Sequence, residues 1–411
     1  MRTLRLLAAA IVAAFATCVR AQESEQFPAA DSSGVRVEIS LLTCSPGAEV
    51  YELYGHTALL VDTVDAGRAT VYNYGVFDFE TPHFVWRFVL GQTDYLLAPQ
   101  PLGRFLYAYA VRGSSVVRQT INATPAEARA IAAALQEEAR PENRVYRYDI
   151  FSNNCTTRAR DMLESHLAGV VVYPARPPRY TLRSLLRRYT GAGTWATEGN
   201  DLLLGVEADT LLSERGEMFA PMMMMAYADS AMIDRGRGRF VPLVVRRDTM
   251  LRADAALHES DVAAQPSFPL PPAAVGWGAL LIGLLIAMAE WRRRSCFAAV
   301  DGLLLTAQGL AGCIVCVLLL FSEHPTVGSN WQAWLLNPLP LLFVVPVVAG
   351  DIRRREHVYH YVAAPLTALF VAAMTVMPQH FATLTLPLAL LLLSRAVVHL
   401  LVYRAWHRAQ I

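Results

Sequence analysis

The sequence predicts an α+β domain with an antiparallel sheet, followed by a five-helix transmembrane domain. Between residues 35 and 167, strand-like and helix-like segments follow one another in the order β–β–helix–β–helix, which is typical of that fold class. After residue 272 the chain consists mainly of apolar runs, several of which reach the roughly 20 residues that a membrane-spanning helix needs. A hydrophobic content of 54% over 411 residues agrees with a chain partly embedded in a membrane.

Residues 1–21 have the pattern of a secretory signal peptide. Two arginines precede the apolar run 6–16, and residues 19–21 offer a cleavage site with small side chains. We therefore expect this segment to be removed on export and residues 22–251 to form a domain in the periplasm.

The exported part begins with segments of alternating polarity that indicate strands. The turn at 65–67 predicts a β-hairpin, and Thr124 followed by Pro125 marks the start of a helix that continues to Arg140. Residues 84–97 are aromatic and apolar. The expected strands cover residues 35–42, 55–63, 69–76, 111–121 and 145–150, and a second helix covers 156–167.

Residues 174–250 carry weaker signals. The expected helices cover 180–189, 195–209 and 214–234, and a last strand covers 240–246. The methionines at 222–225 fit either core packing or a surface near acyl chains. Residues 252–272 predict a linker to the transmembrane domain at 273–411.

Arginines set the expected orientation of the membrane helices. They lie at 292–294, 353–355, 404 and 408, whereas the connections between these groups have none. By the positive-inside rule the Arg-bearing connections and the C-terminus are cytoplasmic. The expected spans are 273–289, 298–321, 336–349, 362–377 and 383–403.

The composition excludes several function classes. A formal net charge of +1 gives no reason to expect a nucleic-acid partner. All 36 basic residues are Arg, and a chain without Lys cannot use Schiff-base chemistry or a Ser–Lys dyad. Of the six Cys, only Cys44 and Cys155 belong to the exported part, so these two can form at most one disulfide.

Cys155 is the candidate nucleophile. It lies at the start of a predicted helix, where unpaired N–H groups and the positive end of the helix dipole favour a thiolate. Asn154 is a good N-cap, and the backbone N–H of Cys155, with a neighbouring donor, would form an oxyanion hole. Because a lone Cys is more often a small hydrophobe or half of a disulfide, the assignment requires a histidine elsewhere in the chain.

His56 is the histidine that we assign as the base. It begins an apolar strand after Gly55, so its imidazole can face a cleft at the end of the sheet. An imidazole on a strand and a thiol at a helix start are the two placements that a papain-like thiol site needs. The alternative without catalysis is that the His56 imidazole is buried in the core with its hydrogen bonds made there.

A third group should orient the imidazole. If the hairpin pairs Thr63 with Ala69, Tyr74 shares the face of His56 as a diagonal neighbour, and we rank it first. A register slip of one residue would present Asn73 instead. Glu52 is a further possibility.

Several sequence fragments together resemble the Lnb-type lipoprotein N-acyltransferases. The order of His before Cys also resembles the circularly permuted papain-like fold of the lecithin:retinol acyltransferase type. The fragments are Thr43-Cys44-Ser45-Pro46-Gly47, Tyr54-Gly55-His56-Thr57-Ala58, Tyr72-Asn73-Tyr74-Gly75, Asn154-Cys155-Thr156-Thr157-Arg158, Leu202-Leu203-Leu204-Gly205, Ser322-Glu323-His324-Pro325 and Leu336-Asn337-Pro338.

The resemblance implies a thiol acyltransferase at the outer face of the bacterial inner membrane. Cys155 would take an acyl chain from a phospholipid as a thioester and pass it to the α-amino group of a diacylglyceryl-cysteine lipoprotein. Five spans suit an enzyme with two lipid-borne substrates, and a thioester suits ping-pong kinetics. We assign Glu52, Arg158, Glu323 and His324 to substrate binding; the last two lie in an Arg-free outer loop.

Two other functions remain open from the residues alone. One is a periplasmic papain-like peptidase or amidase acting on cell-wall peptides. The other is a non-enzymatic envelope protein in which Cys44 and Cys155 form a disulfide. We expect no cofactor and no metal, since His357 and His360 have metal-ligand spacing but no third ligand in sequence.

Overall fold

The computed structural model describes residues 35–47, 49, 52–77, 82–253 and 269–408. The predicted signal peptide at 1–21 lies outside these residues, as does most of the linker predicted at 252–272.

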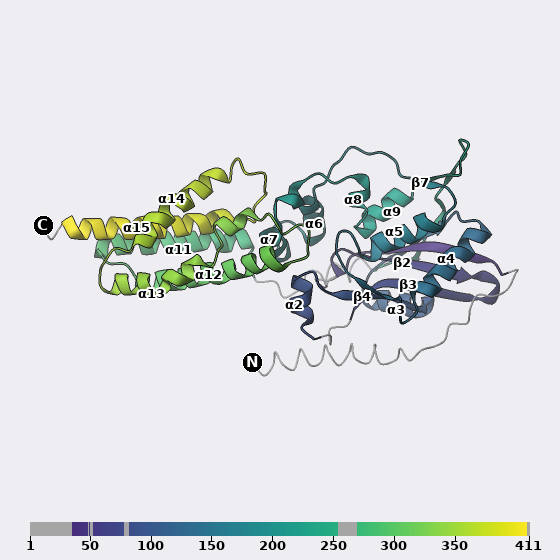
Figure 1. Cartoon of the computed structure of the whole chain (residues 1–411), viewed down its shortest axis with the longest axis horizontal. Helices are drawn as coiled ribbons and strands as arrows, with labels where there is room; N and C mark the ends of the chain where they lie inside the picture. The colour runs from purple at the N-terminus through teal and green to yellow at the C-terminus, as the bar shows by residue number, and fades with distance from the viewer. Residues whose placement is uncertain (1–34, 48, 50–51, 78–81, 254–268, 409–411) are drawn as a thin grey trace. The chain divides into compact units, whose positions relative to one another are not determined.

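A seven-stranded sheet forms the centre of the N-terminal domain, with the strand order β10-β5-β1-β2-β3-β4-β6. Each neighbouring pair of strands is antiparallel, as the sequence predicted. The strands are β1 (Val37–Cys44), β2 (His56–Thr63), β3 (Arg68–Val76), β4 (Asp94–Pro101), β5 (Val116–Ile121), β6 (Val145–Arg147) and β10 (Val244–Leu251). In Figure 1 the strands β2, β3 and β4 lie side by side.

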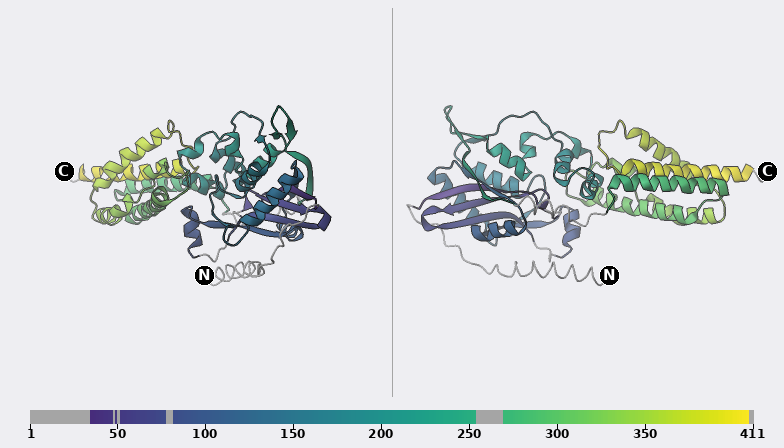
Figure 2. Two further views of the ribbon diagram at one scale, coloured as in Figure 1. Left: turned by 45° about the vertical axis from the view of Figure 1, so that its right-hand side comes forward. Right: turned by 180° about the vertical axis from the view of Figure 1, so that it is seen from behind.

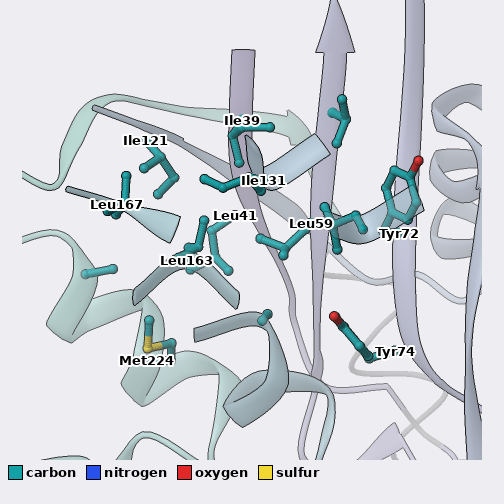
Figure 3. Packing of buried hydrophobic residues seen from close by; sticks show 14 of the residues in the cluster. Ile39, Leu41, Leu59, Tyr72, Tyr74, Ile121, Ile131, Leu163, Leu167 and Met224 are labelled. Atoms are coloured by element: carbon teal, nitrogen blue, oxygen red, sulfur yellow. The ribbon is translucent and has the colours of Figure 1, made fainter. Parts of the chain in front are cut away.

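Helices α4 (Pro125–Glu138), α5 (Cys155–His166) and α9 (Pro221–Ala228) cover one face of the sheet (Figures 1 and 2). Odd-numbered residues of β1 and β2 point to this face because strand side chains alternate. Figure 3 shows how Leu41 and Leu59 of the strands meet Ile131 and Leu163 of the helices.

Helix α3 (Leu102–Val111) packs against the opposite face. Its buried Phe105 and Tyr109 contact the even-numbered side chains, which include Leu60. The two faces therefore hold two separate cores.

Several parts of the domain differ from the prediction. The aromatic stretch after residue 83 forms a short helix, α2 (Phe84–Val89), before β4, and α3 fills a region for which no helix was predicted. The helix predicted over 214–234 is wrong, because α8 (Glu214–Glu217) and α9 are separate and the segment ends in a strand, β8 (Met232–Asp234). That strand forms a second, three-stranded sheet with β7 (Val170–Val172) and β9 (Phe240–Pro242).

A helical segment follows α5 and β7. It contains α6 (Leu182–Thr190), α7 (Trp195–Leu203) and η3 (Val206–Asp209); α6 and η3 share an apolar cluster with Leu204, the residue after α7. Arg183 is 1% exposed and donates to the carboxylates of Asp201 and Asp209 and to the main-chain carbonyls of Asp201, Leu204 and Gly205. A buried guanidinium is tolerated only with such partners, so Arg183 ties the three elements together.

The described C-terminal part, residues 269–408, contains five apolar helices and four stretches that are long and apolar enough to cross a membrane. Helix α14 has 16 residues, as many as the predicted span at 362–377, but it begins and ends four residues earlier and is shorter than the four candidate spans. The helices are α11 (Pro272–Arg293), α12 (Ala298–Phe321), α13 (Leu339–Ile352), α14 (Val358–Ala373) and α15 (Thr385–Arg408). The candidate span that contains α13 begins at Trp331 in the 3-10 helix η4 (Trp331–Trp334).

The register of the β2–β3 hairpin differs by one residue from the predicted one. Thr63 pairs with Arg68, not with Ala69, because the turn is a 3-10 helix, η2 (Val64–Ala66), closed by Gly67 with a φ of 60°. A slip of one residue exchanges the two faces of a strand. The observed register therefore decides which side chain of β3 lies beside His56.

Candidate active site

Cys155 is the first residue of α5, and the local sequence explains why the helix starts there. The side chain of Asn154 accepts hydrogen bonds from the N–H groups of Thr156 and Thr157, at 2.8 and 2.9 Å. The Thr157 hydroxyl accepts in return from the N–H of Asn154, which completes a capping box. The thiol is thereby held at the positive end of the helix dipole.

His56 is the first residue of β2, and Asn73 on β3 lies beside it. Asn73 Oδ1 lies 2.5 Å from His56 Nε2. An amide oxygen can only accept, so Nε2 carries the proton and Nδ1 of the neutral ring keeps its lone pair. This tautomer is the one that a general base needs.

Gly75 lies beside both Cys155 and His56. A Cβ at this position would lie 3.6 Å from both the Cβ of Cys155 and the Cε1 of His56. Gly75 has a φ of +89°, a conformation that glycine adopts without steric cost. Cys155 and His56 therefore border the same small residue, although they are remote in the chain.

The thiol and the imidazole shift each other's pKa values. Burial raises the pKa of Cys155, but the charge of His56 and hydrogen bonds from His56, the Thr57 N–H and the Thr156 hydroxyl outweigh it, so the pKa is lowered. Burial lowers the pKa of His56, but the charge of Cys155 and hydrogen bonds to Cys155 and Asn73 outweigh it, so the pKa is raised. Both shifts favour a thiolate–imidazolium pair.

Tyr74 has a different partner from the one predicted. Its hydroxyl donates to Glu138 at 2.5 Å, and Glu138 also accepts from Arg158 at 2.6 Å. The guanidinium of Arg158 lies 4.1 Å from the centroid of the Tyr146 ring and donates to Asn153. Tyr74 and Arg158 thus belong to one group of side chains between α4 and α5.

Cys44 is the cross-strand partner of His56, and both cysteines of the exported part are free thiols. Cys44 is fully buried, and burial raises its pKa despite a hydrogen bond with Tyr109. The disulfide considered above is therefore not formed. Of the two thiols near His56, only Cys155 has the electrostatic environment of a nucleophile.

The backbone N–H of Cys155 is the candidate oxyanion donor. It has no acceptor among the described residues, as expected for the first turn of a helix. The side-chain amide of Asn154 is already used, because its N–H groups donate to the carbonyls of Ile150 and Phe219. Asn154 therefore positions the helix and offers no side-chain donor to a ligand.

Comparison with known protein families gives two matches that together cover most of the chain. The model of the Lnb N-terminal periplasmic domain matches residues 23–188. The model of the Lnb transmembrane domain matches residues 263–405. The chain belongs to the Lnb family. It matches no curated protein and no solved structure.

Membership of the Lnb family gives the protein a periplasmic N-terminal domain and a membrane domain. It indicates an acyltransferase-like enzyme associated with the membrane. All three residues brought together here, His56, Asn73 and Cys155, lie within the part that matches the periplasmic model.

The Lnb transmembrane domain contributes Glu323 and His324, which lie in the connection between α12 and η4. The N–H of Glu323 donates to the carbonyl of Leu90, and its carboxylate accepts from Gln92 and from Arg147 at 3.2 Å. Both side chains of this ion pair are about half exposed, so the pair contributes little stability by itself.

His324 contacts the turn that leads to Cys155. Its Nε2 lies 3.1 Å from the carbonyl oxygen of Phe88, and its Nδ1 lies 3.7 Å from the carboxylate of Asp149. Asp149 Oδ1 accepts from the N–H groups of Phe151 and Ser152, which shapes the turn before Asn154. The neighbouring carboxylate of Asp149 raises the pKa of His324, against the effect of burial.

Glu52, the other predicted ligand-binding residue of the Lnb periplasmic domain, lies in the connection before β2. Its carboxylate forms an ion pair with Arg112 at 3.1 Å, and its main-chain carbonyl accepts from Gly47 and Gly55. Burial raises the pKa of Glu52, although Arg112 opposes the shift. These contacts hold the segment that places His56 at the end of the sheet.

Sequence reasoning missed how the periplasmic and membrane domains meet. Gly205 donates to the carbonyl of Thr326, and Gln332 donates to the carbonyl of Asp201 at 2.8 Å. Glu198 accepts from Thr383 and Leu384 at the start of α15. The fragment 202–205 quoted above thus contacts the outer connections of the membrane helices, a relationship that no local sequence pattern carries.

Proposed function

We propose that this protein transfers an acyl chain from a membrane phospholipid, through a thioester on Cys155, to the N-terminal amino group of diacylglyceryl-cysteine lipoproteins. The observation that carries the proposal is the meeting of Cys155, His56 and Asn73 beside Gly75 in a chain of the Lnb family. The N-terminal domain lies in the periplasm, and the proposed C-terminus is cytoplasmic.

The first half-reaction loads the enzyme. The Cys155 thiolate attacks the ester carbonyl of the phospholipid, and the oxyanion of the tetrahedral intermediate accepts a hydrogen bond from the Cys155 N–H. When the C–O bond breaks, the His56 imidazolium gives its proton to the leaving oxygen. The products are a lysophospholipid and an acyl thioester, and His56 is neutral again.

The second half-reaction delivers the acyl chain. The neutral amine of the lipoprotein attacks the thioester carbonyl, and His56 takes the proton that the amine loses. The C–S bond then breaks, the thiolate is restored beside the imidazolium, and the product is an amide. Asn73 holds the proton of Nε2 throughout, so Nδ1 remains the nitrogen that exchanges protons.

The contacts between the two domains support a site supplied from the membrane. The turn that presents Cys155 contacts His324 through Asp149, and Glu323 contacts Arg147. We propose that this connection keeps the thiol next to the outer leaflet, and that Glu323 and His324 lie where a lipid head group or the lipoprotein arrives. Arg158 and Glu52 would support this surface through Glu138 and Arg112.

The experiment uses the full chain in vesicles that contain phospholipid with a labelled acyl chain. Incubation without acceptor should place the label on Cys155 as a hydroxylamine-sensitive thioester, seen by mass spectrometry of the labelled peptide. Addition of a diacylated lipopeptide should then move the label to its amino group. The variants Cys155→Ser and His56→Ala should not form the labelled thioester. The control variant Cys313→Ser, which changes a cysteine on α12, should form it.

The outcomes separate acyl transfer from hydrolysis. Cleavage of cell-wall peptides without a lipid thioester would instead identify a peptidase or amidase. An intact, folded protein that forms neither the thioester nor the N-acylated lipopeptide would overturn the proposal. Complementation of a strain that lacks lipoprotein N-acylation, with the same variants, tests the function in cells.

A further inference from the structure

A second group of reactive side chains lies among the membrane helices, outside the site described above. Cys296 precedes α12, Asp351 lies near the end of α13, and His399 lies on α15. One potential ligand atom of each lies within 4.8 Å of the other two. The three residues are 6%, 3% and 0% exposed, so water does not solvate them.

The hydrogen bonds of this group leave polar atoms without partners. His399 Nε2 lies 2.7 Å from Asp351 Oδ1, and the Tyr403 hydroxyl donates to the same oxygen at 3.2 Å. Among the described residues, neither His399 Nδ1 nor Asp351 Oδ2 has a hydrogen-bond partner. Buried polar atoms rarely lack a hydrogen-bond partner, so the unpaired His399 Nδ1 and Asp351 Oδ2 indicate a missing ligand.

A simple ion pair does not account for these atoms. A protonated His399 would pair with Asp351, but its Nδ1–H would then be a buried donor without an acceptor. A neutral His399 avoids that cost and leaves Asp351 as a buried anion. The nearby guanidinium of Arg395 does not neutralise Asp351, because it already donates to the carboxylates of Glu290 and Asp301. Those two negative charges outnumber its single positive charge.

A divalent cation satisfies all of these requirements. The carboxylate of Asp351 and a thiolate of Cys296 together balance a charge of +2, and charge balance matters most where water is excluded. Thiolate, imidazole and carboxylate together are ligands of Zn²⁺, whereas Mg²⁺ and Ca²⁺ prefer oxygen alone. Binding releases the thiol proton of Cys296 to solvent and leaves His399 neutral.

His360 is the nearest additional imidazole. Its ring stacks on that of His399 with centroids 3.7 Å apart, and neither of its nitrogens has a partner among the described residues.

We propose that Cys296, Asp351 and His399 bind one divalent transition-metal ion, with Zn²⁺ the best chemical match. The ion would join α13 and α15 to the start of α12, at the end of the bundle that carries the arginines.

The test measures metal content and does not depend on acyl transfer. The full chain, purified in detergent with a histidine-free affinity tag and no chelator, should contain about one Zn²⁺ per chain by plasma mass spectrometry. Cys296→Ser, Asp351→Asn and His399→Gln should each lose most of it. Two matched controls, Cys316→Ser on α12 and the exposed His380→Gln, should retain it.

A second measurement covers the case in which a variant does not fold. The unmutated protein, stripped with a chelator and titrated with Co²⁺, should develop the near-ultraviolet absorption of a thiolate–cobalt bond at about one equivalent, and its thermal midpoint should rise. An unmutated protein that holds no metal and gives no such band overturns the inference. Retention of metal by folded Cys296→Ser and Asp351→Asn variants does so equally.

Discussion

Asn73 Oδ1 accepts a hydrogen bond from His56 Nε2 at 2.5 Å, and this contact fixes which nitrogen of the imidazole faces Cys155. The contact exists because the hairpin pairs Leu59 with Tyr72, which puts Asn73 on the side of His56. In the neighbouring register Tyr74 would take that place. A shift of one residue in strand register therefore decides whether the His56 imidazole has the Asn73 hydrogen bond that fixes its orientation.

Asn73→Ala should lower the rate of thioester formation about 100-fold, because an unfixed imidazole places its acceptor nitrogen correctly only part of the time. The measurement is single-turnover labelling of Cys155 by phospholipid. Tyr74→Phe is the matched control; it removes the hydroxyl that bonds to Glu138 and should leave the rate nearly unchanged. If the rate of thioester formation fell equally in Asn73→Ala and Tyr74→Phe, Asn73 would affect the rate only through the stability of the folded domain.

Cys155 should react with iodoacetamide at a lower pH than an ordinary thiol does, since the charge of His56 lowers its pKa against the effect of burial. The lowered pKa of the thiol and the raised pKa of the imidazole bound the pH window in which the ion pair exists. In His56→Ala the midpoint of alkylation should move up toward the ordinary value. Labelled peptides read out by mass spectrometry report the site.

Cys44 provides the internal control for that experiment. Burial raises its pKa and excludes reagent, so it should stay unlabelled in the folded protein over the same pH range. Labelling of Cys44 at a rate similar to Cys155 would contradict the assignment of the two thiols.

The contact between His324 and Asp149 should stabilise the protein more at low pH than at high pH. The pKa of His324 is raised in the folded state, so its stabilisation is fully present below the ordinary value of 6.5 and is lost as the pH rises through the raised value. A double-mutant cycle of His324→Gln and Asp149→Asn, followed by thermal unfolding, measures the coupling. A coupling that is constant from about pH 5.5 to about pH 9 would show that His324 does not titrate there.

Arg183→Met should destabilise the chain by about 3–5 kcal/mol, because it leaves Asp201 and Asp209 without their buried cation. Denaturant unfolding of the full chain in detergent gives the free energy of unfolding. Arg188→Met is the control, since Arg188 lies on the exposed side of the same helix and should change stability by less than about 0.5 kcal/mol. A similar small effect for Arg183→Met would mean that Arg187 and His380, which already pair with Asp201 and Asp209, are sufficient partners for the two carboxylates.

Some features of this protein follow from local sequence. The capping pattern Asn154 to Thr157 places a cysteine at the first position of a helix in any fold that forms that helix. Alternation of polarity predicts the strands, and the apolar runs predict the four long membrane helices, because burial and the bilayer impose their periods and lengths directly on the chain.

The sequence by itself determined the strands of the antiparallel sheet, the long membrane helices and the position of Cys155 at the start of a helix. Only the tertiary structure decided that His56 lies beside Cys155, that Asn73 and not Tyr74 contacts His56, that Asp149 meets His324, and that Cys296, Asp351 and His399 converge. The physical reason is range. Helix caps and hydrophobic periods act between near neighbours in the chain, whereas register and side-chain convergence depend on how distant segments pack.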